Sequence, residues 1–108
     1  MGIASRTKAT SVRLQAMVLE PNEVIAQLAS RQPWRLEDGM LTLSLQPESF
    51  DEVCRIVKSI MQIAIDIDHH PDVCFGYRSL LVRTITHDEG GITSKDFDCA
   101  DRILKLIA

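Results

Sequence analysis

All three histidines of the chain lie in the stretch DIDHHPDVCFGYRSLLVRTITH, residues 66–87. His69 and His70 are adjacent and precede Pro71, and His87 closes a run with strand-like alternation. An imidazole titrates near neutrality, so it can both give and take a proton. No good nucleophile arrangement accompanies the histidines, and the pattern therefore favours proton transfer without a covalent intermediate.

Two other interpretations of these residues stay open. Three histidines suffice for a catalytic zinc ion, but a residue before proline favours extended backbone, where neighbours point to opposite sides. His69 and His70 are therefore not expected to chelate one ion, and no metal is predicted. Alternatively, His69 only caps a helix and interacts with its dipole, Asp96 is only a helix cap, and Tyr77 is only sheet surface.

The elements before the histidines follow from hydrophobic periodicity. Residues 19–31 predict a helix with one apolar stripe, which Pro33 ends. Residues 34–46 predict a hairpin with its turn at Asp38-Gly39. A longer helix is expected from about residue 47 or 49 to Asp68.

The long helix is apolar around most of its circumference. Between residues 53 and 67 its polar side chains fall on one narrow stripe: Arg55, Lys58, Ser59, Gln62 and Asp66. A helix on a sheet needs only one apolar face, and a chain of 108 residues offers few elements to cover a second one. We therefore expect a homo-dimer or homo-tetramer formed through helix 49–67.

The elements after the histidine pair complete the fold prediction. Residues 72–79, with Val73, Phe75 and Tyr77 alternating, and residues 80–87 predict two further strands. A last helix is expected over 93–106, with Thr93 as N-cap and Asp96 completing a capping box. The order α-β-β-α-β-β-α predicts an α+β fold, a four-stranded antiparallel sheet with three helices packed on one face.

Composition excludes several classes of protein. A net charge of −3 argues against nucleic acid as a partner, and no apolar run is long enough to cross a membrane. Three cysteines without a CxxC pair suit a reducing compartment, and a cytoplasmic protein is expected. Residues 1–19 predict a flexible tail before a single domain over 20–108. The tail is basic and lacks acids, so a mitochondrial presequence is the alternative.

Together these residues resemble the pterin-4a-carbinolamine dehydratase family, also called the dimerisation cofactor family. The resemblance rests on HHPDVCFGY, on the TH that ends at His87, on the SKD that ends at Asp96, and on Trp34 before the first hairpin. It covers residues 20–108 in element order and agrees with the fold predicted above. It implies removal of water from 4a-hydroxytetrahydropterin to give quinonoid dihydropterin in tetrahydrobiopterin recycling. Neither a metal nor a cofactor is implied, because the pterin is the substrate.

The resemblance also implies roles for individual residues. His69 and His70 become the acid/base candidates, because the hydroxyl at C4a is a poor leaving group that needs an acid, and the ring proton then needs a base. The third histidine, His87, is assigned to pterin binding and charge placement within the catalytic set. Substrate contacts are expected from four other residues: Asp96, which orients its end of the pocket, and Tyr77, Asp68 and Pro71.

The chain departs from the family pattern at two positions. Ile65 stands where the family usually has an acidic residue, with Asp66 beside it, and Val73 stands where animal members have Trp. Asp68 stands where animal members have Asn. Because animal members also stabilise dimers of a homeodomain transcription factor, an interaction module with little or no catalysis is the alternative function. A histidine metalloprotein is a third possibility.

Overall fold

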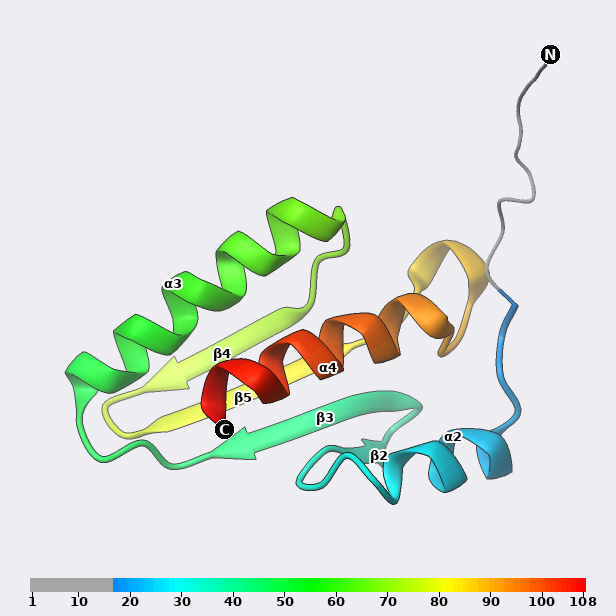
Figure 1. The fold of residues 1–108 in the computed structure, drawn as a ribbon, viewed down its shortest axis with the longest axis horizontal. Coiled ribbons are helices and arrows are strands. Elements are labelled where there is room, and N and C mark those ends of the chain that lie inside the picture. The colour runs from blue at the N-terminus through cyan, green and yellow to red at the C-terminus, as the bar shows by residue number, and fades with distance from the viewer. Residues whose placement is uncertain (1–16) are drawn as a thin grey trace, which may run out of the picture.

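The computed structural model describes residues 17–108, so most of the predicted tail, with its basic segment, lies outside the described residues. The fold is α+β, and the predicted order of three helices and four strands is confirmed, with one short 3₁₀ helix in addition (Figure 1). The elements are α2 (Pro21–Leu28), β2 (Arg35–Glu37), β3 (Met40–Leu45), α3 (Phe50–Ile67), β4 (Asp72–Gly76), β5 (Ser79–Thr84), the short 3₁₀ helix η1 (His87–Glu89) and α4 (Ser94–Ile107).

Two hairpins build one four-stranded antiparallel sheet in the order β2-β3-β5-β4. The first hairpin turns at Asp38-Gly39, where both residues have positive φ, as a two-residue hairpin turn requires. Strand β3 then pairs with β5, with Leu43 opposite Val82. This pairing brings residues that lie far apart in the sequence side by side at the centre of the sheet.

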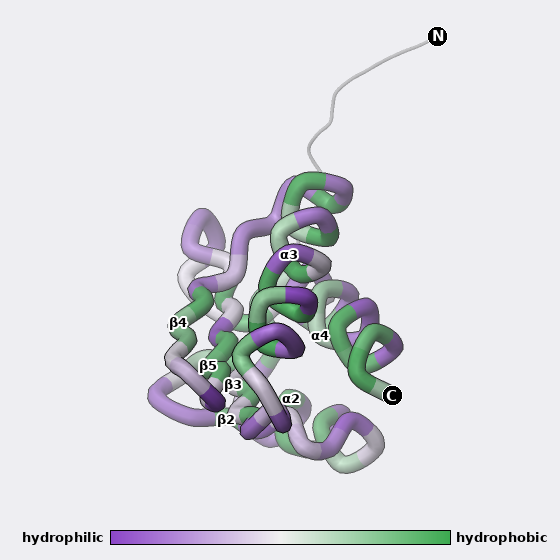
Figure 2. Tube along the Cα trace, turned by 90° about the vertical axis from the view of Figure 1, so that its left-hand side faces the viewer, coloured by the Kyte–Doolittle hydropathy of each residue, from purple (hydrophilic) through white to green (hydrophobic). Residues whose placement is uncertain are grey.

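The core lies between one face of the sheet and the helices. Leu41 and Leu43 of β3 and Leu80 and Val82 of β5 are almost fully buried. They meet apolar residues of α2, α3 and α4 in one cluster that includes Val24, Leu28, Ile56, Ile60, Phe97, Ala100 and Ile103. Figure 2 shows the matching alternation of hydrophobic and hydrophilic segments along α3 and α4.

The two ends of α3 are fixed by local interactions. Ser49 is the N-cap and accepts a hydrogen bond from the backbone N–H of Glu52. At the other end Asp68 adopts the left-handed conformation, with φ 51° and ψ 46°, and the N–H of His69 donates to the carbonyl of Ala64. This ending turns the chain sharply and sets the histidine pair at the corner before β4.

Helix α3 has an apolar surface that the sheet does not cover. Its buried residues are Val53, Ile56, Ile60 and Ala64, whereas Met61 and Ile65 are 57% and 68% exposed. Phe50, at the start of the helix, is also exposed. The helix is therefore apolar on two faces, as the sequence predicts, and only one of them is buried within the chain.

Two details of the second hairpin differ from the sequence prediction. Tyr77 is not a strand residue: β4 ends at Gly76, and Tyr77 and Arg78 form the turn. Strand β5 ends at Thr84, and His87 begins η1 rather than ending the strand. The backbone of Thr86 still pairs with Gly91 beyond that end, so the segment after β5 bends back on itself.

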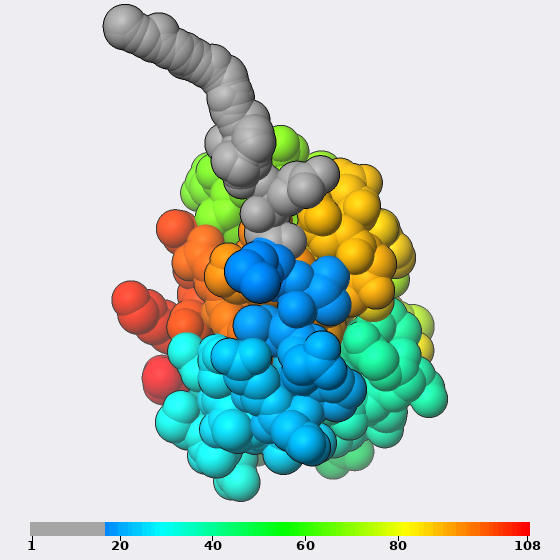
Figure 3. All heavy atoms as spheres, turned by 90° about the vertical axis from the view of Figure 1, so that its right-hand side faces the viewer, coloured from blue at the N-terminus to red at the C-terminus, as the bar shows by residue number. Residues whose placement is uncertain are grey.

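The described chain begins slightly before the predicted domain boundary. The N–H of Leu19 donates to the carbonyl of Ile92 at 2.8 Å, and Leu19 packs against the core. Figure 3 shows this first segment lying against the loop after β5. Within residues 17–108, no helix has the length and hydrophobicity needed to cross a membrane.

Candidate active site

The three histidines lie around one hollow. It has a volume of about 210 Å³ and is lined by His69, His70, Ile85, Thr86, His87, Asp88 and Lys95. The corner after α3 supplies the first two histidines, and the segment after β5 supplies the third. The folded chain thus brings these two segments together at one hollow.

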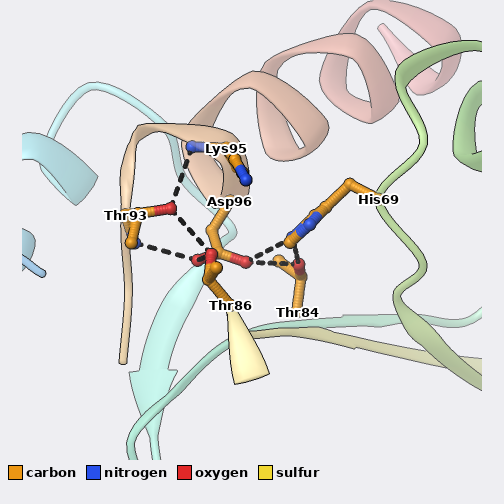
Figure 4. Close-up of polar contacts among 6 residues, drawn as sticks. All are labelled: His69, Thr84, Thr86, Thr93, Lys95 and Asp96. Atoms are coloured by element: carbon orange, nitrogen blue, oxygen red, sulfur yellow. Dashed lines mark hydrogen bonds and ion pairs between the residues drawn. The ribbon is translucent and has the colours of Figure 1, made fainter. Parts of the chain in front are cut away.

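Behind the hollow, His69 is bound to a buried carboxylate. Its Nε2 lies 2.7 Å from Oδ1 of Asp96 and 3.0 Å from Oγ1 of Thr84 (Figure 4). The side chain of His69 is 11% exposed, and that of Asp96 is completely buried. A buried carboxylate is costly unless it is fully hydrogen-bonded, so its other partners matter.

Four donors surround the Asp96 carboxylate. Oδ1 accepts from Thr84 Oγ1 at 2.6 Å as well as from His69. Oδ2 accepts from Thr86 Oγ1 at 2.7 Å and from the backbone N–H of Thr93 at 2.9 Å. The last of these bonds belongs to the capping box of α4, so the carboxylate that helps to cap this helix also holds His69.

A neutral thiol lies beneath this network. Cys99 is fully buried, and burial raises the pKa of its thiol to about 12, with the nearby negative charges of Asp96 and Asp98 adding to the shift. Cys99 is therefore protonated near neutral pH. It adds no negative charge to the floor of the site.

The remaining two histidines are much more accessible. The side chain of His70 is 72% exposed, and its Nε2 lies 3.7 Å from Oδ1 of Asp68, which is itself 95% exposed. His87 is also exposed. Both rings can therefore meet a ligand in the hollow, whereas His69 presents only a small part of its ring.

The predicted substrate contacts lie beside the hollow, buried behind it, or far from it. Asp68 and Pro71 flank the histidine pair at the corner but are not among the residues that line the hollow. Asp96 needs a correction as a ligand contact: it is completely buried and cannot touch a ligand directly, but it reaches the hollow through its hydrogen bond with His69. Tyr77 lies at the β4–β5 turn, at the opposite end of the hairpin from Asp72. Within one chain it is not brought to the histidines.

Sequence reasoning missed several residues of the site. Lys95 and Asp88 line the hollow, and Thr84 and Thr86 hold Asp96 from below. Lys95 and Asp88 carried a signal, because each directly neighbours a predicted site residue. The two threonines also carried one: they fall on the apolar side of the predicted strand 80–87, and buried hydroxyls need partners.

The first of the two positions that depart from the family pattern, Ile65, can also be placed together with its neighbour Asp66. Ile65 points outward from α3 and is 68% exposed. Asp66 beside it is exposed and accepts a hydrogen bond from Gln62 at 2.8 Å. Neither residue lines the hollow. Within residues 17–108, no three His, Cys, Asp or Glu side chains are grouped closely enough to hold a metal ion.

Comparison with known proteins places the chain in a family. Residues 17–106 match the model of the family described as Pterin 4 alpha carbinolamine dehydratase. Proteins of Sulfolobus acidocaldarius and Metallosphaera sedula, each named "Putative pterin-4-alpha-carbinolamine dehydratase", are 37% and 34% identical to the chain. The matches cover 83% and 82% of the chain and 99% and 92% of those proteins.

Solved structures show the same fold. A transcriptional coactivator/pterin dehydratase from Brucella melitensis superposes with a TM-score of 0.81 at 23% identity, over 85% of this chain and 100% of the other. A pterin dehydratase-like protein, described as a RuBisCO assembly factor in the alpha-carboxysome, gives 0.58 at 17% identity, over 68% of this chain and 87% of the other. At these identities the likeness concerns the fold, and the family assignment rests on the sequence matches. The chain belongs to the pterin 4 alpha carbinolamine dehydratase family.

Proposed function

We propose that the chain dehydrates 4a-hydroxytetrahydropterin to quinonoid dihydropterin by histidine acid/base catalysis, without a metal or another cofactor. One observation carries the proposal: His69, His70 and His87 line a single hollow, and a buried carboxylate orients the first of them. The family supports a pterin as substrate. The placement of the histidines supports the roles below.

The reaction needs one proton delivered and one removed. An acid protonates the C4a hydroxyl, the C4a–O bond breaks as the lone pair of the ring nitrogen forms a double bond to C4a, and water leaves. A base then takes the proton from that nitrogen. His70, accessible at the corner, and His69, held by Asp96, are the proposed acid/base pair. His87 binds the pterin across the hollow.

The test is the rate of loss of chemically generated carbinolamine. The wild-type chain should accelerate it, and His70→Ala and His87→Ala should each lower turnover by roughly ten- to ten-thousand-fold, the range of one acid/base group. Their double variant should lose less than the product of the two effects, because residues that act on one step are not additive. Ser30→Ala, at an exposed position after α2, serves as a control outside the hollow. Folded histidine variants with wild-type rates would contradict the proposed roles.

The metal-free part of the proposal needs its own measurement. Activity should survive prolonged treatment with a chelator, and metal analysis of the purified protein should find no stoichiometric ion. Loss of activity on chelation with recovery on adding zinc would replace the acid/base route by a metal-assisted one.

We also propose that the chain works as a homo-oligomer that buries the outer face of α3. Phe50, Met61 and Ile65 give that face an apolar surface, which a monomer would leave in water. Light scattering at micromolar protein tests this. An inert protein that exchanges subunits with another protein would instead favour an interaction module.

A further inference from the structure

Thr84 touches the histidine site from inside the core. It belongs to the row of β5 that faces the helices, together with Leu80 and Val82, and it is 1% exposed. It is not among the residues that line the hollow. Yet its Oγ1 lies within hydrogen-bond distance of both His69 Nε2, at 3.0 Å, and Asp96 Oδ1, at 2.6 Å (Figure 4).

The donors and acceptors in this triangle can be assigned by counting protons. A carboxylate only accepts hydrogen bonds, so the single hydroxyl proton of Thr84 is the one shared with Asp96 Oδ1. Towards His69 the Thr84 oxygen can then only accept. Asp96 Oδ1 also only accepts, and both atoms face Nε2. Two acceptors at one ring nitrogen require that nitrogen to carry a proton.

The other donors around Asp96 keep this assignment consistent. The backbone N–H of Thr93 is an obligatory donor to Oδ2, and the hydroxyl of Thr86 donates to the same oxygen. The hydroxyl of Thr93 then donates to Thr86 Oγ1, 2.7 Å away, and itself accepts from the N–H of Lys95. Each threonine hydroxyl in the network therefore donates its one proton to an oxygen atom. No hydroxyl proton remains that could be donated to Nε2 of His69.

From this geometry we infer that Thr84 is a positioning residue, whose buried hydroxyl, with Asp96, fixes a proton on Nε2 of His69 and leaves Nδ1 as the nitrogen that exchanges protons. Both the neutral ring with its proton on Nε2 and the doubly protonated ring fit the network. The neutral ring with its proton on Nδ1 does not. His69 can therefore gain and lose one proton without rearrangement of its buried contacts. That this proton passes to or from a pterin rests on the proposed function.

The test compares two substitutions at Thr84 with a matched control on the neighbouring strand. Thr84→Val keeps the shape and removes the hydroxyl, whereas Thr84→Ser keeps the hydroxyl. Thr42 of β3 is also completely buried, but its hydroxyl donates to the carbonyl of Met40, away from the site. Thr42→Val therefore reports what the loss of a buried threonine hydroxyl does to the protein in general.

Two readouts are measured on the full chain. Nitrogen-15 NMR of the histidine rings should show His69 protonated on Nε2 in the wild type and in Thr84→Ser and Thr42→Val, and a mixture of tautomers in Thr84→Val. In the dehydration assay, Thr84→Val should lower kcat by roughly tenfold, a part of the effect of one acid/base group. KM should change by less than about twofold, and Thr84→Ser should restore kcat, because the hollow itself is unaltered.

The two readouts separate this inference from the proposed function. A wild-type His69 protonated on Nδ1, or a Thr84→Val protein with the wild-type tautomer, would overturn the role of Thr84. A wild-type chain without dehydratase activity would contradict the proposed function. The NMR spectra would still show which nitrogen of His69 carries the proton. If Thr84→Val does not fold, the wild-type spectrum and Thr84→Ser decide in its place.

Discussion

Nε2 of His69 lies 2.7 Å from Oδ1 of Asp96, although 27 positions separate the two residues in the chain. One of them follows the end of α3, and the other belongs to the first turn of α4. Two helix ends are thus joined by a single hydrogen bond behind the hollow. Because Asp96 also completes the capping box of α4, the start of that helix and the orientation of the histidine depend on the same carboxylate.

This contact predicts that the three histidines differ in their contribution to stability. His69→Ala should lower the free energy of unfolding by about 1–3 kcal/mol, because the buried carboxylate of Asp96 loses a donor. His70→Ala and His87→Ala should change it by less than about 0.5 kcal/mol, since both side chains are exposed. Urea unfolding of the three variants measures the difference. Equal losses in all three would contradict the buried His69–Asp96 contact.

Much of the fold could be predicted from the sequence because its signals are local. The Asp38-Gly39 turn and the Thr93 capping box each depend on a few neighbouring residues, and both are confirmed. The second hairpin turn was missed because Tyr77-Arg78 contains none of the usual turn residues, and its position follows from the pairing of Gly76 with Ser79.

The site was predicted only where it lies close to the histidines in sequence. The contacts of Thr84 and Thr86 with Asp96 depend on how β5 lies beneath α4, and no local pattern specifies that packing. Because this packing cannot be read from the sequence, Asp96 was predicted to contact the ligand directly. A capping residue in the first turn of a helix is usually exposed, and only the sheet below makes this one buried.

The left-handed conformation of Asp68 predicts how substitutions there affect stability. Asp68→Gly should leave the free energy of unfolding unchanged or raise it, because glycine adopts positive φ without a steric penalty. Asp68→Ala should lower it by roughly 1–2 kcal/mol, the penalty of a Cβ in that conformation.

Chemical denaturation compares these variants, and Asp66→Ala is the control inside the regular helix. Asp66 is exposed and its neighbourhood is helical, so alanine should cost little there. If Asp68→Ala and Asp68→Gly were equally stable, the backbone at residue 68 would not have the conformation described.

The buried thiol of Cys99 predicts a loss of stability at alkaline pH. Its pKa is raised from 9.0 to about 12, chiefly by burial. The unfolded chain releases the thiol proton at a lower pH than the folded chain, so the unfolded state binds fewer protons between these values and stability falls as pH rises through them. Below about pH 9 the contribution of Cys99 to folding is fully present.

Unfolding measured from about pH 8 to about pH 10.5 should therefore show a steeper decline for the wild type than for Cys99→Ala. Cys74→Ala is the matched control, because Cys74 is exposed on β4. It should retain the wild-type slope. A Cys99→Ala protein that loses stability as steeply as the wild type would show that another group is responsible.

An isoleucine-to-glutamate substitution should have different effects on the two apolar faces of α3: on one it should unfold the protein, and on the other it should lower the native mass. Ile60 and Ile65 lie on the same helix, but Ile60 is 1% exposed, against the sheet, and Ile65 is 68% exposed. Ile60 cannot report on a subunit interface, because its side chain belongs to the intrachain core. Ile60→Glu should unfold the protein, since it buries a charge without a partner.

Ile65→Glu should instead keep the fold and lower the native mass, because the charge would be buried only when a second chain covers that face. Ile25→Glu on α2 is the control: this isoleucine is 56% exposed on a different helix, so the substitution should leave the mass unchanged. Light scattering gives the mass, and circular dichroism shows that the variants are folded. An Ile65→Glu protein with the mass of the wild type, or a wild type that is already monomeric at micromolar concentration, would rule out the outer face of α3 as the subunit interface.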